Sequence, residues 1–386
     1  MVDRQLNDSC YIKYSIRREE RSRANRTARQ KDEAPPGCIF SGRHGLIRCC
    51  KLALFVATLF ACAQLSPTAC LGAGALSVLN NEFISDGSRI DLRGVAMGDV
   101  LLARKEEHRP VSDYSRIARG WKANVVRLSI LPSVWKYNDK EYILGLLEQE
   151  AAAALAEGMF VIITWHVIGW PDGYYPVQPY GTDDPADMYD SDFTLAKDFW
   201  DKVSGRFGAE GRIMFELWNE PIYSENEYPA LPDRWPTLKP YLKQLTEIIR
   251  THSNNVVLAT GNLWAYDLRG IKDDLLPDPQ TAYAWHVYAG HDDNKVSLWE
   301  EKLDGLDKVR PVMVTEWGFQ RFTTEQYRGT ALTFGLKFVI GILMRHGLGS
   351  TAWCWNPFWG PALVRPDWAT PTAYGAFVRF YLRHAK

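Results

Sequence analysis

The sequence predicts a (β/α)8 TIM barrel of the α/β class, built as a single domain with an N-terminal hairpin. From residue 76 onward, eight short and nearly continuous apolar segments alternate with amphipathic segments of helical period. Such apolar segments are typical of strands in a parallel sheet that is covered by helices. Eight repeating units favour closure into a barrel. No Gly-rich phosphate loop follows the first segment, which argues against a nucleotide-binding open sheet.

The predicted elements follow one another regularly along the chain. Residues 76–95 begin with two short alternating runs separated by Asn-Asn and Asp-Gly turns, which predicts a hairpin leading into the first barrel strand. The clearest helices are expected at 140–158, 190–208 and 237–253, and Gly158 should end the first of them. The eight barrel strands are predicted at residues 91–97, 124–130, 159–165, 212–218, 255–261, 282–288, 311–317 and 350–355.

The N-terminal region, residues 1–72, is expected to lie outside the fold, and residues 73–386 are expected to form the barrel domain. Residues 1–51 hold 12 Lys or Arg against 6 Asp or Glu, show no apolar periodicity and are predicted to be disordered. The apolar segment LALFVATLFACA follows, which has the length of a signal peptide's apolar region and is short for a membrane span. A signal-like segment near residues 48–75 therefore predicts secretion or a periplasmic location.

Composition narrows the function of the barrel domain. The whole chain has a formal charge of −1, so the basic head leaves a mildly acidic body and no reason to expect a nucleic-acid partner. Six of the seven cysteines precede residue 71, so the body can form no internal disulfide. No Cys and His cluster has the spacing of a zinc site, and no metal is expected. We expect a monomer without a stable membrane span after processing.

Ionisable or aromatic residues stand at the C-terminal ends of six predicted strands. These ends form one rim of a barrel, where active sites of the fold lie. Each residue alone has an ordinary structural explanation, but six strands delivering such groups to one rim indicate a functional site. The residues are Arg127, Trp165-His166, Asn219-Glu220, His286-Val287-Tyr288, Glu316-Trp317 and Trp353-Cys354-Trp355-Asn356.

Two of these residues, Glu220 and Glu316, would face each other across the barrel mouth. Carboxylates about 5 Å apart, with no room for water between them, suit the cleavage of a glycosidic bond with retained configuration. Burial and the charge of Glu316 would keep Glu220 protonated as the acid. Arg127 and the Tyr288 hydroxyl would keep Glu316 ionised as the nucleophile. Asn219 is expected to hydrogen-bond a sugar hydroxyl beside the reacting carbon.

The set of strand-end residues resembles glycoside hydrolase family 5, over roughly residues 76–380. That family has Arg on strand two, His on three, Asn-Glu on four, His-x-Tyr on six, Glu on seven and Trp on eight. The matching residues here are Arg127, His166, Asn219, Glu220, His286, Tyr288, Glu316 and Trp355. The resemblance implies a retaining β-glycanase in which Glu220 is the acid and then the base, Glu316 is the nucleophile, and no cofactor takes part.

The substrate class depends on fewer residues. The segments GNLWAYDL and WNP resemble bacterial cellulase-like members of the family and favour an endo-β-1,4-glucanase acting on β-glucan polysaccharide or oligosaccharide. Trp355, Trp264 and Trp170 are candidate platforms for sugar rings. A β-mannanase, a xyloglucanase, a mixed-linkage glucanase, an exo-β-glucosidase and a transglycosylating enzyme remain open. The long segment 164–192 after the third strand is expected to be a binding loop.

Two other classes of function compete with this interpretation. A catalytically silent barrel could bind polysaccharide through its aromatic rim, but such a protein would be expected to lack one of the two glutamates. A hydrolytic metal site could form from His286, His291, Asp292 and Asp293, which lie close together in HVYAGHDD. That alternative gives no role to Arg127.

Overall fold

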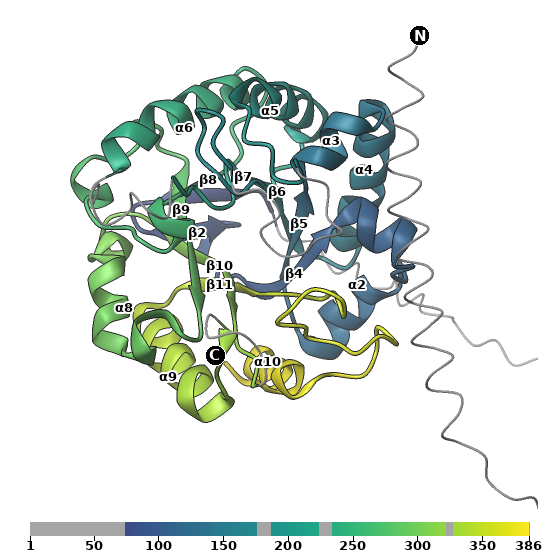
Figure 1. Cartoon of the computed structure of the whole chain (residues 1–386), viewed down its shortest axis with the longest axis vertical. Helices are drawn as coiled ribbons and strands as arrows, with labels where there is room; N and C mark the ends of the chain where they lie inside the picture. Colours follow the sequence, from purple (N-terminus) through teal and green to yellow (C-terminus); the bar gives the residue numbers. More distant parts are fainter. Residues whose placement is uncertain (1–73, 176–186, 224–233, 322–326, 386) are drawn as a thin grey trace, which may run out of the picture. The chain divides into compact units, whose positions relative to one another are not determined.

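The computed structural model describes residues 74–175, 187–223, 234–321 and 327–385. Eight parallel strands close into a barrel in the order β10-β11-β4-β5-β6-β7-β8-β9, which confirms the predicted fold (Figure 1). The predicted head and the signal-like segment up to residue 73 lie outside the described residues. The barrel strands are β4 (Arg93–Asp99), β5 (Val125–Ile130), β6 (Phe160–Trp165), β7 (Ile213–Glu216), β8 (Val257–Thr260), β9 (Thr281–Tyr288), β10 (Val312–Gly318) and β11 (Gly349–Ala352).

Helices surround the strands on the outside of the barrel (Figure 1). The longer ones are α4 (Lys140–Ala156), α5 (Phe193–Phe207), α6 (Trp235–Arg250), α8 (Val296–Leu303) and α10 (Ala373–His384). Shorter turns are η1 (Leu102–Glu106), α2 (Asp113–Ser115), η2 (Arg116–Gly120), α3 (Pro132–Tyr137), α7 (Asn262–Ala265), η4 (Ile271–Asp273), η5 (His291–Asn294), η6 (Leu306–Lys308), η8 (Ala331–Gly335), α9 (Leu336–Phe338) and η9 (Val339–Met344). Over the described ranges, no helix has the length and apolar character to cross a membrane.

The sequence explains where the main helices begin, end and pack. In α4, the Asp139 side chain accepts a hydrogen bond from the backbone of Tyr142, and the chain leaves the helix at Gly158, which has a φ of +79°. Gly158 therefore ends this helix as predicted. In α5, the buried side chains Phe199 and Trp200 pack their rings against Trp165 of β6 and Phe215 of β7, respectively. These contacts fix the helix to the barrel wall.

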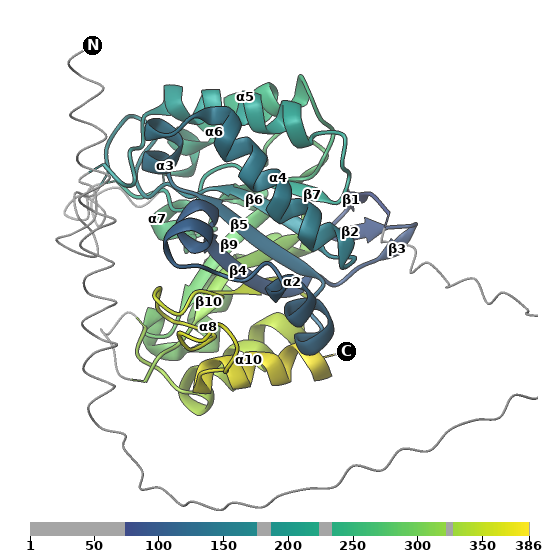
Figure 2. The same cartoon turned by 90° about the vertical axis from the view of Figure 1, so that its right-hand side faces the viewer.

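A small antiparallel sheet closes the N-terminal end of the barrel. Its strands are β1 (Leu76–Leu79), β2 (Glu82–Ser85) and β3 (Ser88–Arg89), one more short strand than the hairpin prediction. Leu76, Val78 and Phe83 join a buried cluster with inward side chains of the barrel strands, such as Ile162 and Met214. Figure 2 shows this sheet and α7, which follows β8, at opposite ends of the barrel. The sheet therefore leaves the C-terminal rim open for a site.

Strand alternation brings polar side chains to the C-terminal rim. Val125 and Ile162 belong to the apolar layer near the hairpin, and Arg127 and Thr164 follow two residues later on the same strands. In β10 the pairing register shifts between Val314 and Glu316. Such a bulge lets two consecutive residues approach the same region.

Three strands end earlier than predicted, β8 by one residue and β7 and β11 by more. β7 stops at Glu216 because the backbone of Asn219 turns to hydrogen-bond Trp165 O of the preceding strand. β11 stops at Ala352, and two residues later the chain bonds to a segment outside the barrel strands, with Cys354 N donating to Pro361 O.

Candidate active site

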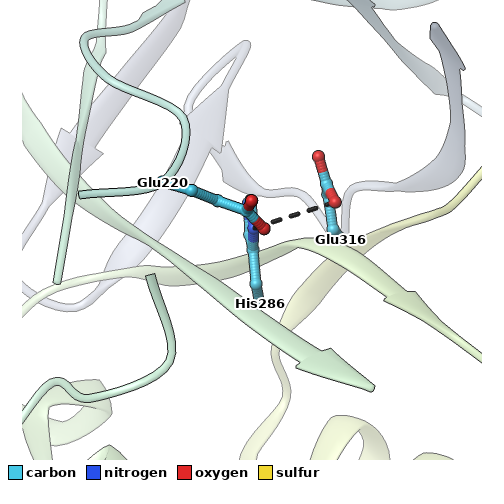
Figure 3. A group of neighbouring side chains, drawn as sticks. All are labelled: Glu220, His286 and Glu316. Atoms are coloured by element: carbon cyan, nitrogen blue, oxygen red, sulfur yellow. Dashed lines mark hydrogen bonds and ion pairs between the residues drawn. The ribbon is translucent and has the colours of Figure 1, made fainter. Parts of the chain in front are cut away.

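Glu220, His286 and Glu316 converge at the C-terminal rim, from the chain after β7, from β9 and from β10 (Figure 3). One carboxylate oxygen of each glutamate and one nitrogen of His286 all lie within 4.8 Å of one another. Glu220 is 8 % exposed and Glu316 is 3 % exposed. The two carboxyl groups therefore approach each other in a nearly dry environment, where neighbouring charges strongly affect protonation.

Arg127 connects several acceptors at the floor of the site. Its guanidinium donates to Glu216 Oε2 at 2.5 Å, to Glu316 Oε1 at 2.6 Å and to Asn219 Oδ1 at 2.7 Å. Arg127 is fully buried, so these charge-assisted hydrogen bonds are shielded from water. The side chain thus holds the carboxylate of Glu316 and the amide of Asn219 in fixed orientations.

Glu216 is a third carboxylate that the sequence analysis missed. It is fully buried, and burial opposes its ionisation, but the charge of Arg127 and the nearby His286 lower its pKa to about 2. Alternation along β7 could have found it, since Glu216 follows the inward-facing Met214 by two residues. An acidic residue that alternation places on the inner face of an apolar strand indicates a residue of the site.

His286 lies between the acidic residues. Its Nδ1 is 3.0 Å from Glu220 Oε1 and 3.8 Å from Glu316 Oε2, and its Nε2 is 3.1 Å from Thr315 Oγ1. The bulge in β10 lets Thr315 and Glu316 both contact this ring. Burial alone would lower the pKa of His286, but the charge of Glu316 and the proximity of Glu216 and Glu220 raise it to about 9. The imidazole is therefore a cation at neutral pH.

The pKa values of the two facing glutamates shift in opposite directions. Burial raises the pKa of Glu220, and the negative charge of Glu316 raises it further. The hydrogen bond from His286 lowers this pKa, but the net shift is upward. For Glu316, burial is outweighed by the positive charges of His286 and Arg127 and by the hydrogen bond from Tyr288, and its pKa falls below the usual value. The Tyr288 hydroxyl donates to Glu316 Oε2 at 2.5 Å. The arrangement can hold one carboxylic acid beside one carboxylate.

Asn219 offers an unused donor beside this pair. Its Oδ1 accepts from Arg127, whereas its buried Nδ2 has no hydrogen-bond partner among the described residues. A buried amide donor without a partner is costly unless a ligand or water satisfies it. Its place next to Glu220 fits a donor for a ligand hydroxyl.

Aromatic rings from the chain after β6 and after β11 form a wall at the rim. The rings of His166 and Trp353 are parallel, with an interplanar angle of 1° and centroids 5.3 Å apart. Trp359 contacts both rings, at 6.3 Å from His166 and 5.9 Å from Trp353. Burial lowers the pKa of His166 to about 3, so this ring is neutral. A flat apolar wall of this kind suits the face of a sugar ring.

Trp355 does not belong to that wall, which corrects the sequence prediction. Its side chain is 0 % exposed, its Nε1 donates to Asp113 Oδ2 at 3.0 Å, and Trp121 packs edge-on against it at 4.7 Å. Both faces of the ring are therefore enclosed by the protein. Trp353, two residues earlier on the eighth unit, stands at the site instead.

The other two predicted platforms differ in exposure. Trp170 is buried against Tyr223, with ring centroids 6.0 Å apart, and its role as a platform stays a prediction. Its loop folds back on itself because Trp170 N donates to Tyr174 O. Trp264 is partly buried, and its backbone N donates to Pro221 O beside the acidic pair. Trp264 therefore lies at the rim next to Glu220.

The residues of the alternative metal site do not converge. His291 Nδ1 accepts from Tyr288 N, and the Asp292 carboxylate accepts from the Tyr266 hydroxyl. Within the described ranges, the group close enough to share an ion is Glu220, His286 and Glu316. A metal here would have to displace the proton that the neighbouring carboxylates hold on His286, and Arg127 already supplies positive charge to Glu316. The residues present therefore fit proton transfer better than a metal site.

The chain is similar to a protein-family model and to curated proteins. A family model described as Cellulase (glycosyl hydrolase family 5) matches residues 84–358. Endoglucanase N of Pectobacterium atrosepticum is 26% identical over 256 residues, which make up 64% of this chain and 50% of that protein. Endoglucanase A of Evansella cellulosilytica is 27% identical over 201 residues, 51% of this chain and 36% of that protein. The chain thus spans half or less of the length of these curated relatives.

Solved structures resemble the fold along most of the chain. The β-glucanase SdGluc5_26A from Saccharophagus degradans, in complex with cellotetraose, has a TM-score of 0.72 and 27% identity, covering 81% of this chain and 94% of that one. The catalytic domain of endoglucanase Cel5A from Thermobifida fusca has a TM-score of 0.65 and 20% identity, covering 80% and 97%. The second likeness concerns the fold alone.

Proposed function

The chain belongs to glycosyl hydrolase family 5, and on this basis we propose that it hydrolyses β-linked glucan with retention of configuration, using Glu220 and Glu316. The observation that carries the proposal is the approach of these two buried carboxyl groups to within 4.8 Å, in surroundings that favour opposite protonation states. Retaining glycosidases place their carboxyl groups about 5–5.5 Å apart, whereas inverting enzymes leave space for a water molecule.

The charge balance of the site supports this division of roles. Arg127 and protonated His286 contribute two positive charges, and ionised Glu216 and Glu316 contribute two negative charges. A neutral Glu220 makes the buried group electrically balanced, which avoids an uncompensated buried charge. The acid therefore rests with its proton available for transfer.

In the first step, a carboxylate oxygen of Glu316 attacks the anomeric carbon as the bond to the leaving-group oxygen breaks. The proton of Glu220 moves to that oxygen, and a glycosyl ester of Glu316 forms. In the second step, Glu220 takes a proton from water, the water oxygen attacks the anomeric carbon, and Glu316 leaves as a carboxylate. Two inversions give a product with the original β configuration. Arg127 and Tyr288 hold Glu316 in position throughout.

We propose β-1,4-linked glucan as the substrate and internal bonds as the point of attack. The relatives named as endoglucanases and the β-glucanase solved with cellotetraose support a glucan substrate. The Trp353 wall and the free amide donor of Asn219 provide the stacking surface and hydrogen-bond donor that a pyranose needs. Mannan, xyloglucan and exo-acting cleavage are distinguished by product sizing on a panel of purified polysaccharides.

Rescue of two variants by azide tests the roles. Glu316→Ala should lose turnover of an aryl β-cellobioside, and azide should restore part of it by occupying the vacated space and attacking from the opposite face. The product is then the α-glycosyl azide. Glu220→Ala should still react with a good leaving group, which needs little protonation, and azide should give the β-glycosyl azide in the second step.

The matched control is Glu301→Ala, which removes an exposed carboxylate of α8 and should leave turnover unchanged. A β-glycosyl azide from Glu316→Ala would exclude Glu316 as the nucleophile. Equal losses on good and poor leaving groups would contradict the acid role of Glu220.

We also propose that the protein is exported by its signal-like segment near residues 48–75. The apolar run with small residues at its end supports this proposal. Fractionation of the producing cells and N-terminal sequencing of the mature protein test it. An intracellular protein that retains this segment would contradict it.

A further inference from the structure

The two catalytic strands divide the rim of the barrel into two arcs. In barrel order, β8 and β9 lie between β7, which leads to Glu220, and β10, which carries Glu316. The opposite arc holds β11, β4, β5 and β6, and it includes the His166 and Trp353 wall. The arc of β8 and β9 carries its own polar and aromatic side chains, centred on His291. The proposed reaction gives that histidine no role so far.

The ring of His291 is held by two tyrosines. Tyr266 packs against it with ring centroids 4.3 Å apart, and the Tyr288 ring meets it edge-on at 6.4 Å. The Tyr266 hydroxyl is in turn bonded to Asp292. Since Tyr288 donates its hydroxyl to the proposed nucleophile, His291 stands one side chain away from the reacting centre.

The backbone around His291 is constrained by its own hydrogen bonds. Gly290, with a φ of +106°, turns the chain out of β9, and its N–H donates to Asn294 Oδ1 at 3.3 Å. Lys295 N donates to Asp292 O at 3.0 Å and closes the turn. The imidazole therefore projects from a short turn with a defined geometry.

These contacts leave His291 with one free donor. The ring accepts the Tyr288 N–H at Nδ1, at 3.4 Å, so the neutral tautomer carries its hydrogen on Nε2. Burial lowers the pKa of His291 to about 4, which keeps the ring neutral. In the described part of the chain, no group accepts a hydrogen bond from Nε2.

The leaving group must depart on the side of Glu220, since that residue protonates its oxygen. Trp264 lies against the backbone of Pro221, directly after Glu220, and it belongs to the same arc as His291. A leaving-group sugar whose oxygen takes the proton of Glu220 would therefore lie beside the arc of β8 and β9. Building on the proposed function, we propose that His291 is a specificity-determining residue whose Nε2–H donates a hydrogen bond to a hydroxyl group of the leaving-group sugar.

The test compares two substrates with the same glycone. In cellotetraose the leaving group is a sugar, whereas in an aryl β-cellobioside it is an aromatic ring without the sugar hydroxyls. His291→Phe keeps an aromatic ring against Tyr266 and removes both nitrogens. We expect it to lower kcat/KM for cellotetraose by about 3- to 12-fold, the effect of one net hydrogen bond, and to leave the aryl substrate within twofold of wild type.

Two further variants separate binding from structural roles. His291→Ala should give the same selective loss, and Asp293→Ala, an exposed neighbour in the same turn, should change neither rate. Equal losses on both substrates, or no loss on cellotetraose, would overturn the role of His291 while leaving the retaining mechanism intact. Failure of the wild-type protein to cleave any β-glucoside would instead overturn the proposed function and, with it, this inference.

Discussion

Replacing Tyr288 by phenylalanine should move the acidic limb of the pH–activity profile. The hydroxyl donates to Glu316 Oε2 at 2.5 Å, and both residues are nearly inaccessible to solvent. A hydrogen bond to a charged group contributes about 1.5–3 kcal/mol, which corresponds to a change of roughly one to two pKa units. Because the lost bond stabilises the carboxylate, its removal raises the pKa of Glu316.

The direction of the shift follows from the protonation state that the reaction needs. In the proposed mechanism Glu316 attacks as a carboxylate, so activity should be lost as pH falls through its pKa. Tyr288→Phe therefore moves the acidic limb of kcat/KM to higher pH, by roughly one to two units. The assay is the release of nitrophenol from an aryl β-cellobioside across the pH range, which reports the free enzyme.

Tyr374→Phe is the matched control for this variant. Its buried hydroxyl donates to the backbone oxygen of Trp317 at 2.6 Å, next to Glu316 in sequence. The change removes a buried tyrosine hydroxyl without touching the carboxylate, so it should lower stability and leave the acidic limb in place. An unmoved limb in Tyr288→Phe, or equal shifts in both variants, would show that the Tyr288 hydroxyl does not set the pKa of Glu316.

Three other changes probe the same site. Arg127→Met leaves Glu216 and Glu316 with a single buried cation, His286, between them. The change should cost about 3–5 kcal/mol of unfolding free energy, measured by denaturant titration. A loss below about 1 kcal/mol contradicts this. Glu216→Gln removes a negative charge 3.9 Å from His286 and should lower the His286 pKa from about 9 by roughly one to two units; an unchanged value in an NMR titration of labelled histidine contradicts this. Trp353→Ala should raise KM for cello-oligosaccharides about tenfold. Trp355→Phe should lower the free energy of unfolding by about 1–2 kcal/mol and leave KM unchanged. Similar KM values for the two variants would contradict the placement of the two rings.

The fold follows closely from the sequence because each barrel strand is a compact apolar segment with turn residues around it. Alternation along β5 predicts that Arg127 faces inward with Val125, and the structure places both residues inside the barrel. The same rule applies to Glu216, and a search for acidic residues on the inner faces would have included it. The positions of Glu220 and Glu316 follow from strand ends that all meet at one rim.

The two tryptophans of the eighth unit show where sequence periodicity fails. Trp353 and Trp355 are two residues apart, so a continuous strand would place them on the same face. The strand ends at Ala352 instead, and Trp355 N bonds to Ala96 O while its indole reaches Asp113. These partners lie more than 200 positions away in sequence, and local pattern carries no information about them.

The loop after β6 is a second place where the local sequence pattern does not predict how a tryptophan is covered. A rim tryptophan in a long loop suggests a sugar platform, but Trp170 is covered because its loop closes through Trp170 N and Tyr174 O. Gly169, with a φ of +146°, permits this closure, since a side chain there would meet Tyr174 O at 2.3 Å.

Covalent trapping of the intermediate identifies the residue that attacks the anomeric carbon. A 2-deoxy-2-fluoro β-cellobioside with a good leaving group slows both steps, and the ester that accumulates can be located by peptide mass spectrometry. We expect one added glycosyl group per chain, attached to the peptide that contains Glu316 and absent in Glu316→Gln. A label on Glu220, or turnover with inverted configuration and no covalent adduct, would contradict it.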